Sequence, residues 1–197
     1  MQIISQSYFG NGTRTELPNI TTATGEASDL TELQAFITLK EVDYLEGFFG
    51  YELATIIQDA ITAFNGGVAP TTPIPSRIAD ILTGAEFTDI HGRLQKWKGL
   101  QRADLVSPIA DYVYYHWRRM KISDTTISGE MVNDPESSTD IGAGQKMVTN
   151  WNYGVDQNKI LADFIRANSA SYPEYVFSVL GQSEKRNLLS KINLFGI

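Results

Sequence analysis

Apolar residues at helical spacing run through most of the chain and predict a mainly α-helical protein. Within residues 39–65 they recur every three or four positions, as Val42, Leu45, Phe49, Leu53, Ile56, Ile57, Ala60, Ile61 and Phe64. Thr38 and Glu41 have the spacing of a capping box, so a helix is expected to begin there. Gly47 and Gly50 predict a bend that divides the segment into two helices, and the glycine pair at 66–67 is expected to end the second.

Two short elements are expected in the middle of the chain. Residues 76–82 predict a short helix that Gly84 stops. Residues 85–97 contain two runs of strand-forming residues on either side of His91 and Gly92. This arrangement is typical of a tight β-hairpin.

A second helical region covers residues 100–121, which carry alanine, valine and aromatic residues at helical intervals. Pro108 either kinks this helix or restarts it behind Ser107, because proline lacks the backbone donor of a helix interior but suits a first turn. Residues 122–138 place few apolar residues among Ser, Thr, Asp and Gly and predict a long loop or extended excursion.

A long helix is expected over residues 139–168, and it has two apolar stripes. The first holds Met147, Val148, Trp151, Val155, Leu161, Ala162 and Ile165, and the second holds Tyr153, Ile160 and Phe164. Either the helix is central to its own domain, or the second stripe contacts a neighbouring copy of the chain.

The two ends of the chain differ in composition. Residues 1–28 are rich in Thr, Asn, Gly and Ser, which predicts an extended arm that is a poor candidate for core. Residues 182–197 form an apolar tail that must dock on its own core or on a partner, through Leu188, Leu189, Ile192, Leu194 and Phe195. Residues 29–181 lie between them as one domain. The expected fold is therefore a helical bundle with a small β-hairpin and extended terminal arms.

Charge is unevenly distributed along this chain of net charge -7. Residues 26–65 contain eight acidic residues and one basic residue, whereas residues 91–121 contain seven basic residues and two acidic ones. Both segments could be solvated helix faces, or the two could meet between identical copies arranged head to tail. In the second case, neutralising Arg93, Lys96 and Lys98 together should weaken assembly more at low salt than at high salt. The overall acidity disfavours tight binding to DNA.

Few residues suggest catalytic chemistry. The chain has no cysteine and two histidines, of which His91 falls in a predicted turn and His116 in an aromatic helix, where it is expected to be a packed or interface side chain. Glu41, Asp43 and Glu46 match no cation-binding loop and are expected on a solvated face. No phosphate-binding or hydrolase motif occurs. We expect no enzyme activity, cofactor or metal, and neither an export signal nor a membrane span.

Aromatic and glycine motifs follow one another in a characteristic order. They are Tyr44-Leu45, Phe48-Phe49-Gly50, Trp97-Lys98-Gly99-Leu100, Tyr112 to Trp117, Lys146 to Asn152, and Tyr172-Pro173-Glu174 with Phe177. Over about residues 30–180, this order resembles the head-to-tail connector proteins of tailed bacteriophages. The likeness is to the adaptor or head-completion proteins of phages of Bacteroidetes, including crAss-like phages.

The resemblance implies a structural virion protein in the phage neck, between capsid and tail and made in the host cytoplasm. Its copies would form a dodecameric ring below the portal protein, contact other neck or tail proteins and extend the channel through which double-stranded DNA passes without specific binding. Expected subunit or portal contacts are Tyr153, Ile160, Phe164, Arg93, Lys96, Lys98 and the apolar tail residues. The alternative is a bacterial cytoplasmic module that binds one protein partner.

Overall fold

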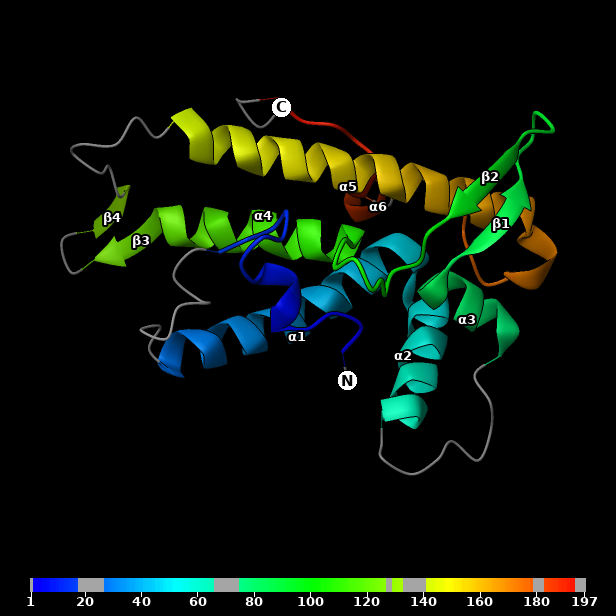
Figure 1. Cartoon of the computed structure of the whole chain (residues 1–197), viewed down its shortest axis with the longest axis horizontal. Helices are drawn as coiled ribbons and strands as arrows, with labels where there is room; N and C mark the ends of the chain where they lie inside the picture. Colours follow the sequence, from blue (N-terminus) through cyan, green and yellow to red (C-terminus); the bar gives the residue numbers. More distant parts are fainter. Residues whose placement is uncertain are drawn as a thin grey trace.

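The computed structural model describes residues 2–17, 27–65, 75–126, 129–132, 141–178 and 183–193. Its two longest helices among the described residues are α1 (Ala27–Phe49) and α5 (Ile141–Ala167), and α4 (Pro108–Ile122) is shorter. In Figure 1, α4 lies between α1 and α5, and it packs against both. The remaining helical elements are η1 (Gln6–Phe9), α2 (Tyr51–Asn65), α3 (Ser76–Thr83), η2 (Ser169–Ser171) and α6 (Ser183–Leu188). The expected mainly helical fold with a small β-hairpin is confirmed.

The first long helix starts earlier than its capping pattern predicts. α1 begins at Ala27, and Thr38 lies inside it, with its hydroxyl donating to the backbone carbonyl of Gln34. The buried stripe continues upstream through Leu33 and Ile37, so core packing extends the helix beyond the local cap pattern. The expected helix start at Thr38 is therefore wrong.

Only one of the two glycines in this region interrupts the helix. Gly50 has a φ of 80° and separates α1 from α2, so the division into two helices is confirmed. Gly47 lies within α1, where a Cβ atom would come within 3.1 Å of Cβ of Glu184 in α6. Its role is to let α6 approach α1 closely.

The β1–β2 hairpin and the Pro108 restart agree with the sequence patterns. β1 (Ala85–Thr88) pairs antiparallel with β2 (Leu94–Trp97), and α3 ends at Gly84 as expected. α4 starts at Pro108, and the hydroxyl of Ser107 accepts a hydrogen bond from the backbone N–H of Ile109. Residues 100–107 form turns and irregular structure. The prediction that a helix begins at Pro108 is therefore confirmed, and the prediction that the helix begins at residue 100 is wrong.

A second hairpin occupies part of the expected excursion at 122–138. β3 (Ser123–Thr126) pairs antiparallel with β4 (Gly129–Val132). The rest of that segment, residues 127–128 and 133–138, lies outside the described residues.

The N-terminal segment, residues 2–17, contributes to the core, and the expectation that it is a poor candidate for core is wrong. Its buried side chains are Ile3, Ile4, Tyr8, Phe9 and Leu17. Glu41 of α1 accepts backbone hydrogen bonds from Ile3 and Ile4, and Arg14 forms an ion pair with the buried Asp111 of α4. Glu41, 2% exposed, is thus not on a solvated face. The carboxylates of Glu41 and Asp111 thus accept hydrogen bonds from donors of the N-terminal segment, which allows this polar segment to be buried.

Candidate interaction surface: a groove between three helices

A groove of about 680 Å³ lies between α1, α4 and α6, and we call it the α1–α4–α6 groove. It exists because Gly47 allows α6 to cross α1 closely while α4 stands beside them. Its lining residues are Lys40, Asp43, Glu46, Gly47, Gly50, Tyr112, His116, Ser183, Glu184 and Lys185. Elements far apart in the sequence therefore build one concave surface.

The α4 wall of this groove is aromatic. The rings of Tyr112 and His116 are 4.4 Å apart, and the Tyr115 ring lies 4.6 Å from that of Trp151 on α5. These four residues also line an adjoining hollow of about 240 Å³, which reaches Ile192. Aromatic rings packed edge-on or tilted against one another form a rigid surface that loses little side-chain entropy when covered, which suits protein contact.

His116 is held in its neutral form. Burial lowers its pKa to about 4, and the nearby cations Lys40 and Arg119 act in the same direction. A neutral imidazole packed between rings is a structural side chain, in agreement with the expectation from the sequence. It carries no charge at neutral pH to attract an anion.

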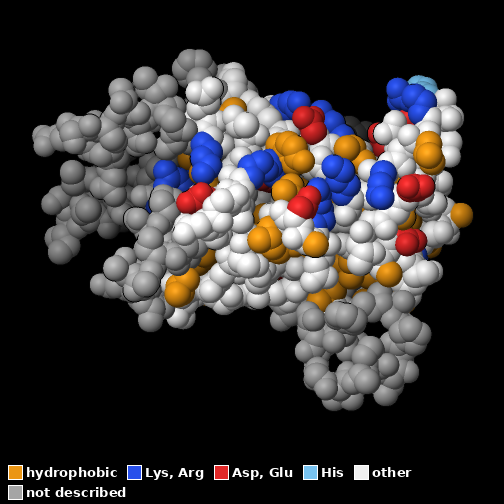
Figure 2. Space-filling model, in the orientation of Figure 1, with side chains coloured by type: hydrophobic (Ala, Val, Ile, Leu, Met, Phe, Trp, Pro, Cys, Tyr) orange, Lys and Arg blue, Asp and Glu red, His pale blue; other side chains and the backbone are white. Residues whose placement is uncertain are grey.

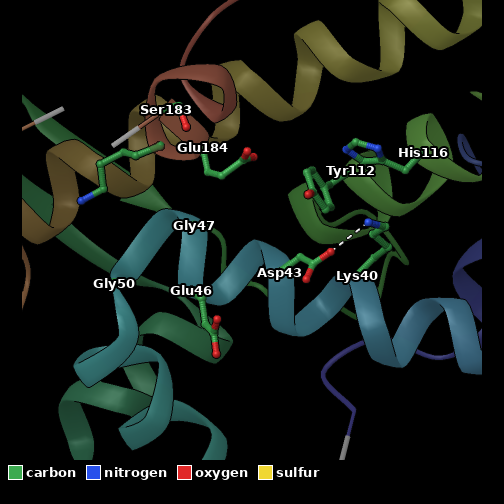
Figure 3. Close-up of a pocket in the computed structure, with 10 residues that line it drawn as sticks. Lys40, Asp43, Glu46, Gly47, Gly50, Tyr112, His116, Ser183 and Glu184 are labelled. Atoms are coloured by element: carbon green, nitrogen blue, oxygen red, sulfur yellow. Dashed lines mark hydrogen bonds and ion pairs between the residues drawn. The ribbon is translucent and has the colours of Figure 1, made fainter. Parts of the chain in front are cut away.

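Carboxylates stand on the other walls of the groove. Figure 3 shows Glu184 of α6 and Asp43 of α1 pointing toward the space beside Tyr112, while Glu46 points away from it. Asp43 is paired with Lys40 at 2.8 Å. Glu46 and Glu184 are exposed and form no ion pair with any described residue. The groove therefore joins an aromatic wall to unpaired negative charge.

Lys185 lines the groove but is itself buried. Its side chain is 1% exposed, its ammonium lies 3.9 Å from the centre of the Tyr175 ring, and it donates to the backbone carbonyl of Val176. Burial lowers its pKa to about 8. The cation is used to fasten residues 175–176 against α6.

The C-terminal tail docks on its own chain as far as residue 193. Trp151 donates its indole N–H to the carbonyl of Ser190, and Asn152 exchanges two hydrogen bonds with Ile192 at 2.9 and 2.8 Å. Leu188 is buried and Leu189 is partly buried against the core. Leu194 and Phe195 lie outside the described residues. Residues 183–193 of the tail therefore dock on their own chain rather than on a partner.

The second apolar stripe of α5 is covered mainly by the chain itself. Phe164 is buried, with its ring 5.6 Å from that of Phe87 in the hairpin. The guanidinium of Arg14 lies 3.7 Å from the centre of the Tyr153 ring, and Ile160 packs against the core. A side chain as buried as Phe164 has almost no surface left for a second molecule, so the intramolecular alternative describes this stripe better.

The basic residues predicted for assembly lie on the β1–β2 hairpin and just after it. Arg93 is paired with Asp89 at 2.8 Å, whereas Lys96 and Lys98 are exposed and form no ion pair with the described part of the chain. Ile90 and Leu94, which the sequence analysis did not single out, are each 72% exposed at the tip. Figure 2 shows basic and histidine side chains at this projecting tip, near the upper right, with apolar ones beside them.

The described residues contain no group of three or more potential metal-ligating side chains. None of the helices searched, all within the described residues, has both the length and the apolar character needed to cross a bilayer. The chain matches no protein-family model, and neither a curated protein nor a solved structure shows significant similarity to it.

Proposed function

We propose that this protein is a structural subunit of the neck of a tailed bacteriophage. Its copies would form a ring below the portal, extend the DNA channel and provide a docking surface for the tail. The proposal is supported by two different surfaces that could contact other molecules. One is the α1–α4–α6 groove, and the other is the exposed apolar tip of the β1–β2 hairpin. A ring subunit needs two such surfaces, because each copy contacts its two neighbours through different faces.

The order of aromatic and glycine motifs supports the same assignment. Most of these aromatic residues serve the internal framework, as Tyr44, Phe48 and Phe49 do in α1, where all are buried. Tyr112 and Trp151 line the groove system and link that framework to the proposed contact surface. A net charge of -7 suits a channel through which DNA slides, since like charges repel and the protein does not grip phosphate.

Native mass spectrometry of the full chain, alone and with a portal protein encoded beside it, tests this proposal. The expected result is a high-order ring, either alone or templated by the portal. A one-to-one complex with a single bacterial protein would instead favour the cytoplasmic interaction module. A chain that stays monomeric with the portal, and that antibodies fail to detect at the neck of purified particles, would overturn the neck assignment.

A further inference from the structure

The β1–β2 hairpin presents apolar side chains on a fixed base. Trp97 is fully buried, and its indole N–H donates to the carbonyl of Ile81. Gly84 and Gly99 bring the chain before β1 and the chain after β2 into close contact, since a Cβ on either would lie 2.5 Å from a backbone oxygen. The isoleucine and leucine at the tip, Ile90 and Leu94, are exposed in the isolated chain.

Internal ion pairs remove part of the charge from both charged segments. The pairs that do so join Lys121 to Glu32, Arg93 to Asp89, Arg102 to Asp104, and Lys40 to Asp43. The acidic and basic segments therefore also meet within one chain, through the ion pair between Lys121 and Glu32. The charged side chains that form no ion pair among the described residues are the ones available for contact between copies.

The unpaired charges are positive on the hairpin and negative at the groove. On the hairpin side, the exposed Lys96 and Lys98 remain without an ion pair among the described residues, although Glu86 lies opposite Lys96 in the strand register. At the groove, Glu184 remains unpaired in the same sense and points toward the space beside Tyr112, whereas Glu46 points away from it. Opposite charges on two separate surfaces of one chain favour contact between copies.

We infer that the β1–β2 hairpin of one copy docks in the α1–α4–α6 groove of a second copy, with Lys96 and Lys98 facing Glu184. Ile90 and Leu94 enter the groove beside the Tyr112 ring. This contact rests on the proposed function, because it would be the lateral interface of the ring. The occupant of the groove is a second copy of the chain, since the basic hairpin and the acidic groove residue both belong to this sequence. The groove volume of about 680 Å³ leaves room for two aliphatic side chains.

Cysteine crosslinking tests this contact cleanly, because the chain has no cysteine of its own. Full-length Leu94→Cys and Glu184→Cys proteins are mixed at high concentration and treated with a short thiol-to-thiol crosslinker. The expected product is a mixed dimer, and a chain carrying both substitutions should give a ladder of oligomers. Leu39→Cys, at a leucine 57% exposed and not among the groove-lining residues, is the matched control for Glu184→Cys as partner of Leu94→Cys.

Charge reversal separates a specific contact from random collision. Lys96→Glu with Lys98→Glu should lower the yield of the mixed product by about threefold or more, because the exposed attraction to Glu184 becomes a repulsion. Combining it with Glu184→Lys, with the groove cysteine moved to Ser183→Cys, should restore the yield. A mixed yield no higher than the Leu39→Cys control, or no rescue in the combined variant, would overturn the inference.

The same experiments distinguish failure of the inference from failure of the proposed function. A ring in native mass spectrometry without hairpin-to-groove crosslinks leaves the neck role intact and rejects this interface. Crosslinks between hairpin and groove in a species that closes as a twofold dimer, with no ring when the portal is present, support the contact and reject the ring.

Discussion

Glu41 and Ile3 are tied together across 38 positions of sequence, since the backbone N–H of Ile3 donates to both carboxylate oxygens of Glu41 at 3.0 and 2.8 Å. Ile4 adds a third hydrogen bond to the same carboxylate. The N-terminal segment is thus held on α1 by one buried acidic side chain. Burial raises the pKa of Glu41 to about 7, although these backbone donors act against the shift.

The first prediction concerns the pH dependence of stability. Because the folded chain binds a proton at Glu41 more tightly than the unfolded chain, the stabilising contribution is complete below about pH 4.5 and is lost as pH rises through about 7. A pKa rise of this size corresponds to about 3 kcal/mol. Urea unfolding between pH 5 and 8 should show Glu41→Gln with a shallower decline in the free energy of unfolding than the unsubstituted chain.

Part of that decline should persist in the Glu41→Gln protein. Burial also raises the pKa of Asp111 to about 7, with Arg14 acting in the opposite direction, so Asp111 titrates in the same pH range. Glu46→Gln, at an exposed position of the same helix, is the matched control and should keep the full decline. Identical pH profiles for the two glutamine variants would contradict the assignment to Glu41.

Elements with local patterns were the ones that the sequence predicted well. α3, the β1–β2 hairpin and α5 each combine an apolar period with a nearby turn or stop residue, and each lies close to its expected range. The N-terminal segment has no such pattern. Its burial depends on contacts with Glu41 of α1 and Asp111 of α4, which are distant from it in the sequence.

The groove could not be predicted because it has no local signature. Its walls come from α1, α4 and α6, and its shape depends on Gly47 meeting Glu184 across a helix crossing. In the sequence, Gly47 suggested a bend, whereas in the fold it provides space. The exposed tip was partly detectable, since Leu94 and Trp97 place apolar residues on both faces of a four-residue strand that has one buried face.

Two glycines of the hairpin region should respond differently to a methyl group. Gly99 has a φ of 94°, and a Cβ there would lie 2.5 Å from the carbonyl oxygen of Leu82. Gly92 has a φ of 77° with nothing within 4 Å. Gly99→Ala should lower the free energy of unfolding by about 3 kcal/mol or more, and Gly92→Ala by about 1 kcal/mol. Equal losses in urea titrations would show that the close contact does not constrain the hairpin base.

The hydroxyl of Tyr44 should contribute to stability through one buried hydrogen bond. It donates to the side-chain oxygen of Asn158 at 2.5 Å, and the amide nitrogen of Asn158 donates to the carbonyl of Leu188. Tyr44→Phe leaves the buried oxygen without its donor, at a cost of about 1–3 kcal/mol. Tyr51→Phe, at a tyrosine 76% exposed, should change stability by less than about 0.5 kcal/mol. A similar effect of both substitutions in thermal unfolding would remove this link between α1, α5 and α6.

His116 should make the chain less stable in mild acid, with the opposite sign from Glu41. Its pKa is lowered from 6.5 to about 4, so the unfolded chain binds a proton more readily, and stability is lost as pH falls through this window. The full loss is about 3 kcal/mol. His116→Phe keeps an aromatic ring beside Tyr112 but does not titrate, so its free energy of unfolding should fall less between pH 6.5 and 4. The control is His91→Phe, in the exposed hairpin turn, which should lose as much free energy of unfolding between pH 6.5 and 4 as the unsubstituted chain. If His116→Phe lost the same amount as His91→Phe, burial would not be holding His116 neutral.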